Sequence, residues 1–94
     1  MNIHFKPVSY DLQQNYSNPF NPSTTINYQR PQTGFVMLNI YDILGKEVST
    51  LVNEQKNQGK YSVNFDASTL ASGVYIYQLR ANDYVSSKKM LFLK

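Results

Sequence analysis

The side chains that could support acid–base or metal chemistry are few and widely spaced. The only histidine, His4, lies in the N-terminal segment, so a serine–histidine–aspartate arrangement has no credible base. Asp42, Glu47 and Glu54 lack the spacing of a metal-binding loop, and the chain has no cysteine and no glycine-rich phosphate loop. Aspartates stand near predicted strand ends or turns, where they commonly accept backbone hydrogen bonds, at Asp11, Asp42, Asp66 and Asp83. We therefore predict no enzyme activity and no catalytic, cofactor or metal site.

Tyrosine offers a second chemistry, because exposed rows of tyrosine on a β-sheet can stack on sugar rings. Tyr75 and Tyr77 share one face of a predicted strand. The same spacing suits packing in a core or between two sheets, which we favour for this pair. Tyr41, Tyr61 and Tyr84 are compatible with either role.

The C-terminal segment carries a cluster of positive charge. Lys88, Lys89 and Lys94 flank a continuous apolar run over residues 90–93. Lysines on an edge strand discourage pairing with other chains, and they would equally serve recognition by a partner, so both roles stay open. Elsewhere the basic residues are spread along a chain of formal net charge +3, and we predict no nucleic-acid binding.

The elements that position these residues are strands. Tyrosine, phenylalanine and β-branched residues are frequent, and apolar positions alternate with polar ones. Seven segments follow this pattern, at residues 10–15, 24–29, 35–42, 46–53, 61–66, 74–81 and 84–93. We expect tight turns at Leu44-Gly45 and Asn82-Asp83, and a bulge at Leu51. The fold class predicted is all-β, a seven-stranded antiparallel immunoglobulin-like β-sandwich.

One local pattern supports this fold. Leu70, Gly73 and Tyr75 resemble the tyrosine corner of immunoglobulin-like sandwiches, and Tyr77 stands where antibody domains place their second cysteine. Since the chain forms no disulfide, we expect aromatic packing to join the two sheets.

Four segments resemble, in the right order, the motifs of the type A C-terminal sorting domains of the type IX secretion system. Residues 15–26 are similar to the N-terminal signature, residues 41–48 to the central hairpin, and residues 70–77 and 88–94 to the two closing motifs. The resemblance extends over residues 10–94. The structural positions that it carries over are Asn18, Pro19, Phe20, Asn21, Pro22, Tyr41, Asp42, Leu44 and Gly45.

The loop over residues 16–23 belongs to the first of these motifs. Two prolines fix the backbone there, and we expect Phe20 and Tyr16 to anchor the loop on the sandwich. The family usually has a Pro-Asn-Pro element, whose first proline is replaced here by Ser17.

The resemblance implies a non-catalytic secretion signal attached to the C-terminus of a larger cargo protein. The implied partners are the cargo domain, an outer-membrane translocon and a sortase-like peptidase. The implied route runs through the periplasm to the cell surface or the medium. Translocon recognition would rest on Gly73, Tyr75, Lys88, Lys89, Met90, Leu91, Phe92, Leu93 and Lys94.

Three further expectations accompany this interpretation. Residues 1–9 are predicted to be a linker and residues 10–94 the sorting domain, with Met1 beginning an excised piece or an interior fragment. The terminal strand would support weak homodimerisation. The alternative function is an immunoglobulin-like glycan-binding or spacer module of a surface protein.

Overall fold

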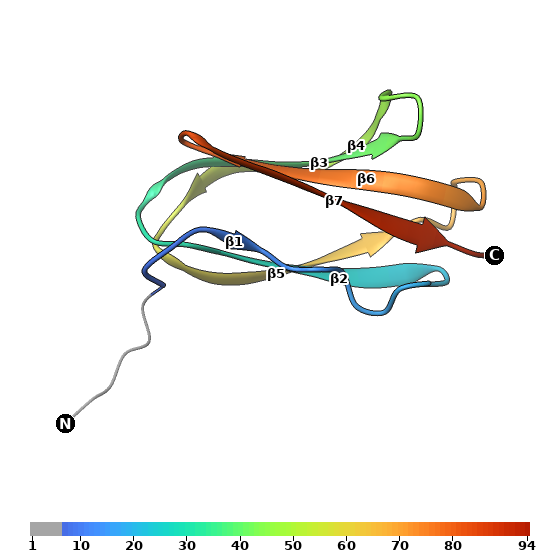
Figure 1. Cartoon of the computed structure of the whole chain (residues 1–94), viewed down its shortest axis with the longest axis horizontal. Coiled ribbons are helices and arrows are strands. Elements are labelled where there is room, and N and C mark those ends of the chain that lie inside the picture. Colours follow the sequence, from blue (N-terminus) through green and yellow to red (C-terminus); the bar gives the residue numbers. More distant parts are fainter. Residues whose placement is uncertain (1–6) are drawn as a thin grey trace.

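The computed structural model describes residues 7–94, which form seven strands arranged in two facing sheets (Figure 1). The strands are β1 (Asp11–Leu12), β2 (Ser23–Arg30), β3 (Gly34–Asp42), β4 (Glu47–Lys56), β5 (Gly59–Asp66), β6 (Gly73–Ala81) and β7 (Tyr84–Phe92). One sheet has the order β1-β2-β5 and the other the order β4-β3-β6-β7. Every strand pair is antiparallel, so the predicted seven-stranded antiparallel sandwich is confirmed. None of the described residues forms a helix that could span a membrane.

The core follows the two-residue period of the strands. Val36, Leu38 and Ile40 of β3 are fully buried between the sheets, as their shared face predicts. Ile26 and Tyr28 of β2 lie opposite them in the other sheet, and both are buried. Burying an aliphatic side chain of this size stabilises the fold by about 1.5–3 kcal/mol. The alternating pattern therefore identifies the core correctly.

The tight turns also agree with the sequence. Gly45 has φ +85° in the β3–β4 hairpin, where Asp42 Oδ1 accepts hydrogen bonds from the N–H groups of Leu44 and Lys46 at 2.9 Å. Asn82 has φ +55° in the turn between β6 and β7. Leu51 has no partner in the β3–β4 register, so the predicted bulge is present.

Two details of the N-terminal part differ from expectation. The first strand covers only residues 11 and 12 instead of 10–15, because the regular ladder with β2 stops after Leu12 and continues only as a Gln13 N–H bond to Asn27 O and an isolated bridge between Tyr16 and Thr25. Of the two expected anchors of the following loop, Phe20 is buried, but Tyr16 is 80% exposed. The prediction for Tyr16 was wrong, since its neighbour Asn15 takes the buried position instead.

Gly73 should resist substitution because of its backbone. Its φ is +157°, a value that L-residues rarely adopt, and nothing lies within 4 Å of where a Cβ would stand. We expect Gly73→Val and Gly73→Ala each to lower the free energy of unfolding by about 1–3 kcal/mol, through backbone strain alone. Urea denaturation measures the change.

Gly59→Ala is the matched control, because a Cβ there makes only ordinary contacts with Tyr61 at 3.6–3.7 Å. If Gly73→Ala is as stable as Gly59→Ala, the strain at Gly73 is refuted.

Candidate recognition site

The terminal strand β7 lies at the edge of the four-stranded sheet and pairs with β6 in one unbroken register. Side chains of β7 alternate across the sheet. Met90 and Phe92 face the core, with 1% and 0% of their surface exposed, and Lys88 is half-buried on the same side. Lys89 points the other way and is exposed. One face of β7 therefore contributes side chains to the core, and the other face is exposed to solvent.

The loop before β2 covers the outer edge of β7 near its end. Asn18 Oδ1 accepts a hydrogen bond from the Leu91 N–H at 2.9 Å. The Phe20 N–H donates to Leu91 O at 3.0 Å, and the Leu93 N–H donates to Phe20 O at 3.1 Å. Gln14 Nε2 adds a bond to Lys89 O at 2.7 Å. We call this set of contacts, between residues 14–20 and 89–93, the interlock.

The Phe20 ring completes the interlock from inside. It stacks on Phe92 with ring centres 5.3 Å apart and meets Phe65 edge-on at 6.3 Å. Phe65 belongs to β5 and Phe92 to β7, so the three rings connect the two sheets. Such aromatic pairs add about 0.5–1.5 kcal/mol each beyond their buried area.

Tyr77 ties the same N-terminal segment to the middle of β6. Its hydroxyl accepts a hydrogen bond from the Asn15 N–H at 2.8 Å and donates one to Gln13 O at 2.7 Å. Burial raises the pKa of Tyr77 to about 12. The side chain of Asn15 is itself buried and bonded to Thr24 Oγ1 at 2.9 Å. Antibody domains have a disulfide-forming cysteine at the position of Tyr77. Here the Tyr77 hydroxyl instead joins β6 to the N-terminal segment through two hydrogen bonds.

Tyr75 forms the predicted tyrosine corner. Its hydroxyl donates to Ala71 O at 2.7 Å, four residues earlier in the chain. Tyr75 is 7% exposed and Tyr77 is fully buried. The expectation that this pair packs in the core is confirmed, and neither ring is available for stacking on a sugar.

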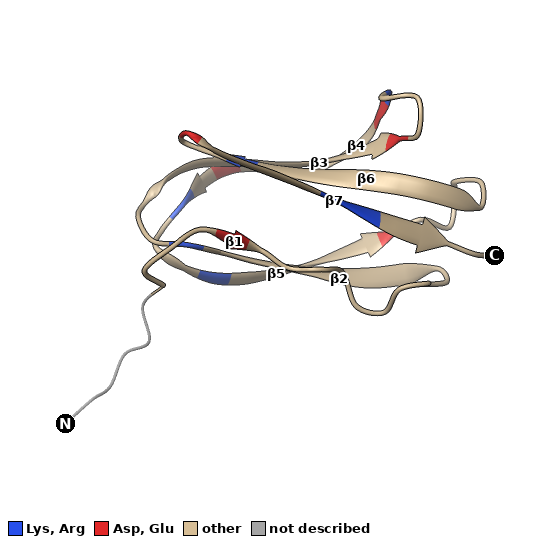
Figure 2. Ribbon diagram, viewed as in Figure 1, with Lys and Arg blue, Asp and Glu red and all other residues tan. Residues whose placement is uncertain are grey.

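The residues proposed for translocon recognition fall into three groups by exposure. Tyr75, Met90 and Phe92 are buried, whereas Gly73, Lys88 and Leu91 are half-buried, and Lys89, Leu93 and Lys94 are exposed. A partner of the folded domain can contact the last two groups only. Among the residues that the structure describes, the one salt bridge joins Lys56 to Glu54, so no carboxylate is paired with the terminal lysines. Figure 2 shows the basic and acidic positions along the ribbon.

The structure also joins two motifs that the sequence presents separately. Asn18 and Phe20 contact the last motif directly, and Pro22 O accepts a hydrogen bond from the Ala67 N–H at 2.9 Å. The hairpin motif with Asp42 and Gly45 lies apart from them, at the β3–β4 turn. Gln14 and Asn15 were missed by sequence reasoning, since nothing local distinguishes them from other loop amides.

Arg30 was missed as well, although its place in the alternation of β2 could have revealed it. It follows Ile26 and Tyr28 on the inward face and is 1% exposed. Its guanidinium donates to Gly34 O at 2.8 Å and to Gln32 O, and it lies over the Tyr10 ring at 5.8 Å. This cluster closes the sandwich near the β2–β3 turn.

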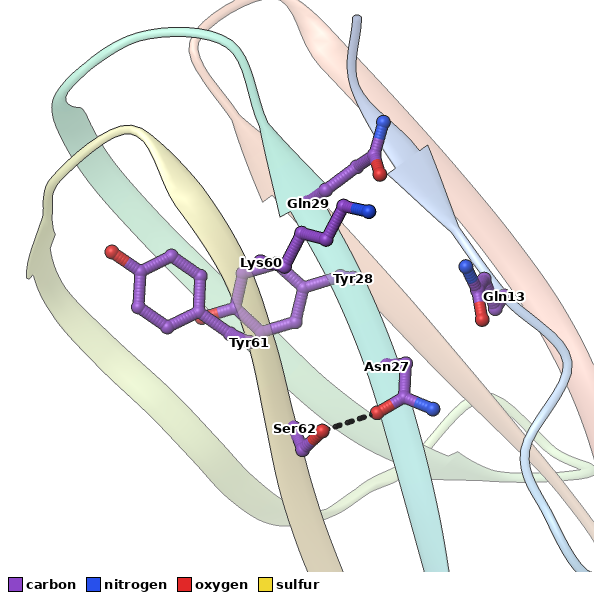
Figure 3. A pocket seen from close by; sticks show the side chains of 7 residues that line it. All are labelled: Gln13, Asn27, Tyr28, Gln29, Lys60, Tyr61 and Ser62. Atoms are coloured by element: carbon purple, nitrogen blue, oxygen red, sulfur yellow. Dashed lines mark hydrogen bonds between the residues drawn. The ribbon is translucent and has the colours of Figure 1, made fainter. Parts of the chain in front are cut away.

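A polar hollow of about 260 Å³ opens on the three-stranded sheet (Figure 3). Amides, a hydroxyl, a lysine and two stacked tyrosines line it: Gln13, Asn27, Tyr28, Gln29, Lys60, Tyr61 and Ser62. Burial raises the pKa of Tyr28 to about 12. In residues 7–94 no three histidine or acidic side chains gather as metal ligands, and His4 lies outside the described residues. The hollow can offer hydrogen bonds but no acid–base pair.

The sandwich, the interlock and the basic terminal strand together indicate a small interaction module. The sequence profile of the secretion system C-terminal sorting domain matches residues 14–93, so the chain belongs to this family of type IX secretion signals. No curated protein matches the chain. No solved structure matches it either.

Replacing Tyr77 by phenylalanine should weaken the domain and change its response to alkali. Loss of the hydroxyl leaves the Asn15 N–H and Gln13 O without their partner, which costs about 1–3 kcal/mol at neutral pH. The raised pKa means that the unfolded chain loses the Tyr77 proton first, so stability declines as pH rises from about 10 to about 12. Tyr77→Phe should make this decline shallower.

Urea denaturation at several pH values measures both effects, with Tyr16→Phe as the control because Tyr16 is exposed. An alkaline decline that is the same in Tyr77→Phe and in the unmodified chain would exclude this role for the phenol.

Proposed function

We propose that the domain directs a cargo protein, attached to its N-terminal side, across the outer membrane to the cell surface or the medium. The cargo reaches the periplasm by a separate signal, and the folded domain is then recognised by an outer-membrane translocon. A sortase-like peptidase removes the domain at the surface. The domain itself carries out no catalysis.

The observation that supports this function best is the interlock. It holds the end of β7 through the backbone of Leu91, while Lys89, Leu93 and Lys94 remain exposed. The recognition residues therefore present a fixed surface only when the whole sandwich is folded. Tyr75, Met90 and Phe92 contribute by holding the strand in place, and Gly73, Lys88 and Leu91 border the exposed surface.

A second candidate function is glycan binding, and the polar hollow supports it. Asn27, Gln29 and Lys60 offer hydrogen bonds, and Tyr61 contributes an aromatic edge. Sugars are recognised by such combinations of polar groups and aromatic carbon. In this function the domain would be a binding or spacer module of a surface protein.

A transplant experiment tests the first function. Residues 7–94 are fused to the C-terminus of a reporter with an ordinary export signal, in a bacterium with type IX secretion. We expect the reporter at the cell surface, and its loss from the surface in a translocon-deficient strain. A folded domain whose reporter stays in the periplasm would contradict the sorting function, and glycan arrays would then test the second candidate.

The exposed lysines can be tested without disturbing the fold. Removing residues 88–94 would also delete buried Met90 and Phe92, so it confounds export with unfolding. We expect the double variant Lys89→Ala, Lys94→Ala to keep its melting temperature and to lower surface delivery about tenfold, the effect of losing one or two charged contacts.

The double variant Lys46→Ala, Lys60→Ala is the matched control, because both lysines are exposed and lie on other elements. Equal delivery by the two double variants would show that the terminal lysines have no special role.

A further inference from the structure

The outer edge of β7 is only partly covered, and its backbone geometry shows where it is open. Leu91 directs its N–H and its C=O toward the interlock, away from β6. In an antiparallel pair the hydrogen-bonding direction alternates along the strand, and the register of β6 with β7 has no shift. Lys89, Ser87 and Val85 therefore direct their backbone groups to the same outer side as Leu91.

The interlock occupies this outer side only from Lys89 onward. Gln14 bonds Lys89 O, and the bonds of Asn18 and Phe20 lie further toward the C-terminus. Within residues 7–94, β7 has no second strand neighbour. The N–H of Lys89 and both backbone groups of Ser87 and Val85 are thus left facing outward. They form an open edge over residues 85–89, about 17 Å long at the usual strand rise.

Two shallow hollows lie beside this open edge. One, of about 240 Å³, is lined by Ile76, Ser87, Lys88 and Lys89. The other, of about 160 Å³, is lined by Asn18, Val74, Lys89, Met90 and Leu91. Both have apolar walls and both touch Lys89. When a peptide adds a strand to a sheet edge, its backbone hydrogen bonds provide affinity. Pockets that accept every second side chain of the peptide provide specificity.

The charged residues of β6 and β7 themselves are all basic, and Asp83 lies in the turn that joins the two strands. Arg80, Lys88 and Lys89 lie on β6 and β7, and neither strand contains an acidic residue (Figure 2). A second copy of the chain would bring another formal net charge of +3 to this edge. A partner strand with acidic side chains would instead meet complementary charge.

The other free edges are less suited to pairing. Strand β4 is interrupted by register shifts near Leu51 and Val48, and it carries Glu47 and Glu54. Strand β5 is the edge of the three-stranded sheet. The hollow beside it opens on the face of that sheet and not along the strand edge, and its one charged residue is Lys60, so β5 offers neither a row of side-chain sites nor a cluster of charge to an added strand.

We propose that residues 85–89 of β7 are a strand-addition site for an extended segment of the secretion machinery that carries acidic side chains. The segment extends the four-stranded sheet by one strand and ends where Gln14 begins to cover β7. Lys89 contacts its acidic side chains, while one of its side chains enters the hollow lined by Ile76, Ser87, Lys88 and Lys89. The inference rests on the proposed sorting function and specifies how the terminal strand is recognised.

The reporter fusion tests this inference through backbone substitutions. Ser87→Pro removes an outward N–H without removing a bond to β6, and proline is tolerated in that setting. Ser87→Ala is the control, because it removes the same hydroxyl and keeps the N–H. We expect Ser87→Pro to lower surface delivery about fivefold and Ser87→Ala to leave it unchanged, since a lost backbone hydrogen bond is worth about 1 kcal/mol. Val85→Pro provides the same test if Ser87→Pro does not fold.

The charge requirement is tested at Lys89 in the same fusion. Lys89→Glu should block delivery and Lys89→Arg should preserve it. Lys46→Glu, at an exposed lysine outside both the open edge and the polar hollow, should deliver normally. Normal delivery by a folded proline variant overturns strand addition, even if Lys89→Glu is blocked. A dimer in sedimentation analysis that Ser87→Pro dissociates would assign the edge to a second copy and overturn it too. Failure of the unsubstituted fusion to reach the surface would refute the sorting function itself, which separates the two hypotheses.

Discussion

The hydrogen bonds between Phe20 and the end of β7 are the contact on which the rest of the structure depends. They place the Phe20 ring against Phe92 and Phe65, and they bring Asn18 to the Leu91 N–H. Without them the end of β7 would lose its backbone hydrogen bonds to the N-terminal segment, and the aromatic contact between the sheets would open. The first and last motifs of the family are therefore two halves of one structural unit.

The sandwich is stabilised without any disulfide, since the chain has no cysteine. Hydrogen-bonded aromatic side chains take over the cross-linking. Tyr77 connects β6 to the segment before β2, and Tyr75 fixes the corner that precedes it. At the other end Arg30 packs beneath Tyr10, which stacks on Tyr84 with ring centres 5.0 Å apart. Such a domain does not depend on the redox state of its compartment.

Much of the fold could be predicted because it depends on local patterns. Alternation revealed the inward faces of β2 and β3, and glycine and asparagine revealed the hairpin turns. The interlock could not be predicted in this way, since Asn18 and Leu91 are distant in sequence and no periodic pattern encodes their contact. The family resemblance named the right segments but did not relate them to one another. Tyr16 was misassigned because apolar content alone does not decide which loop residue is buried.

The direction of the interlock has a mechanical consequence. The bridge between Phe20 and Phe92 is parallel, so the N-terminal segment runs in the same sense as β7. The described chain starts toward one end of the long axis, and the end labelled C lies at the other (Figure 1). Traction from an N-terminal cargo, with β7 held by a partner, would pull the two segments in opposite directions along their length. That geometry loads the interlock in shear, so its hydrogen bonds share the force instead of peeling apart one by one.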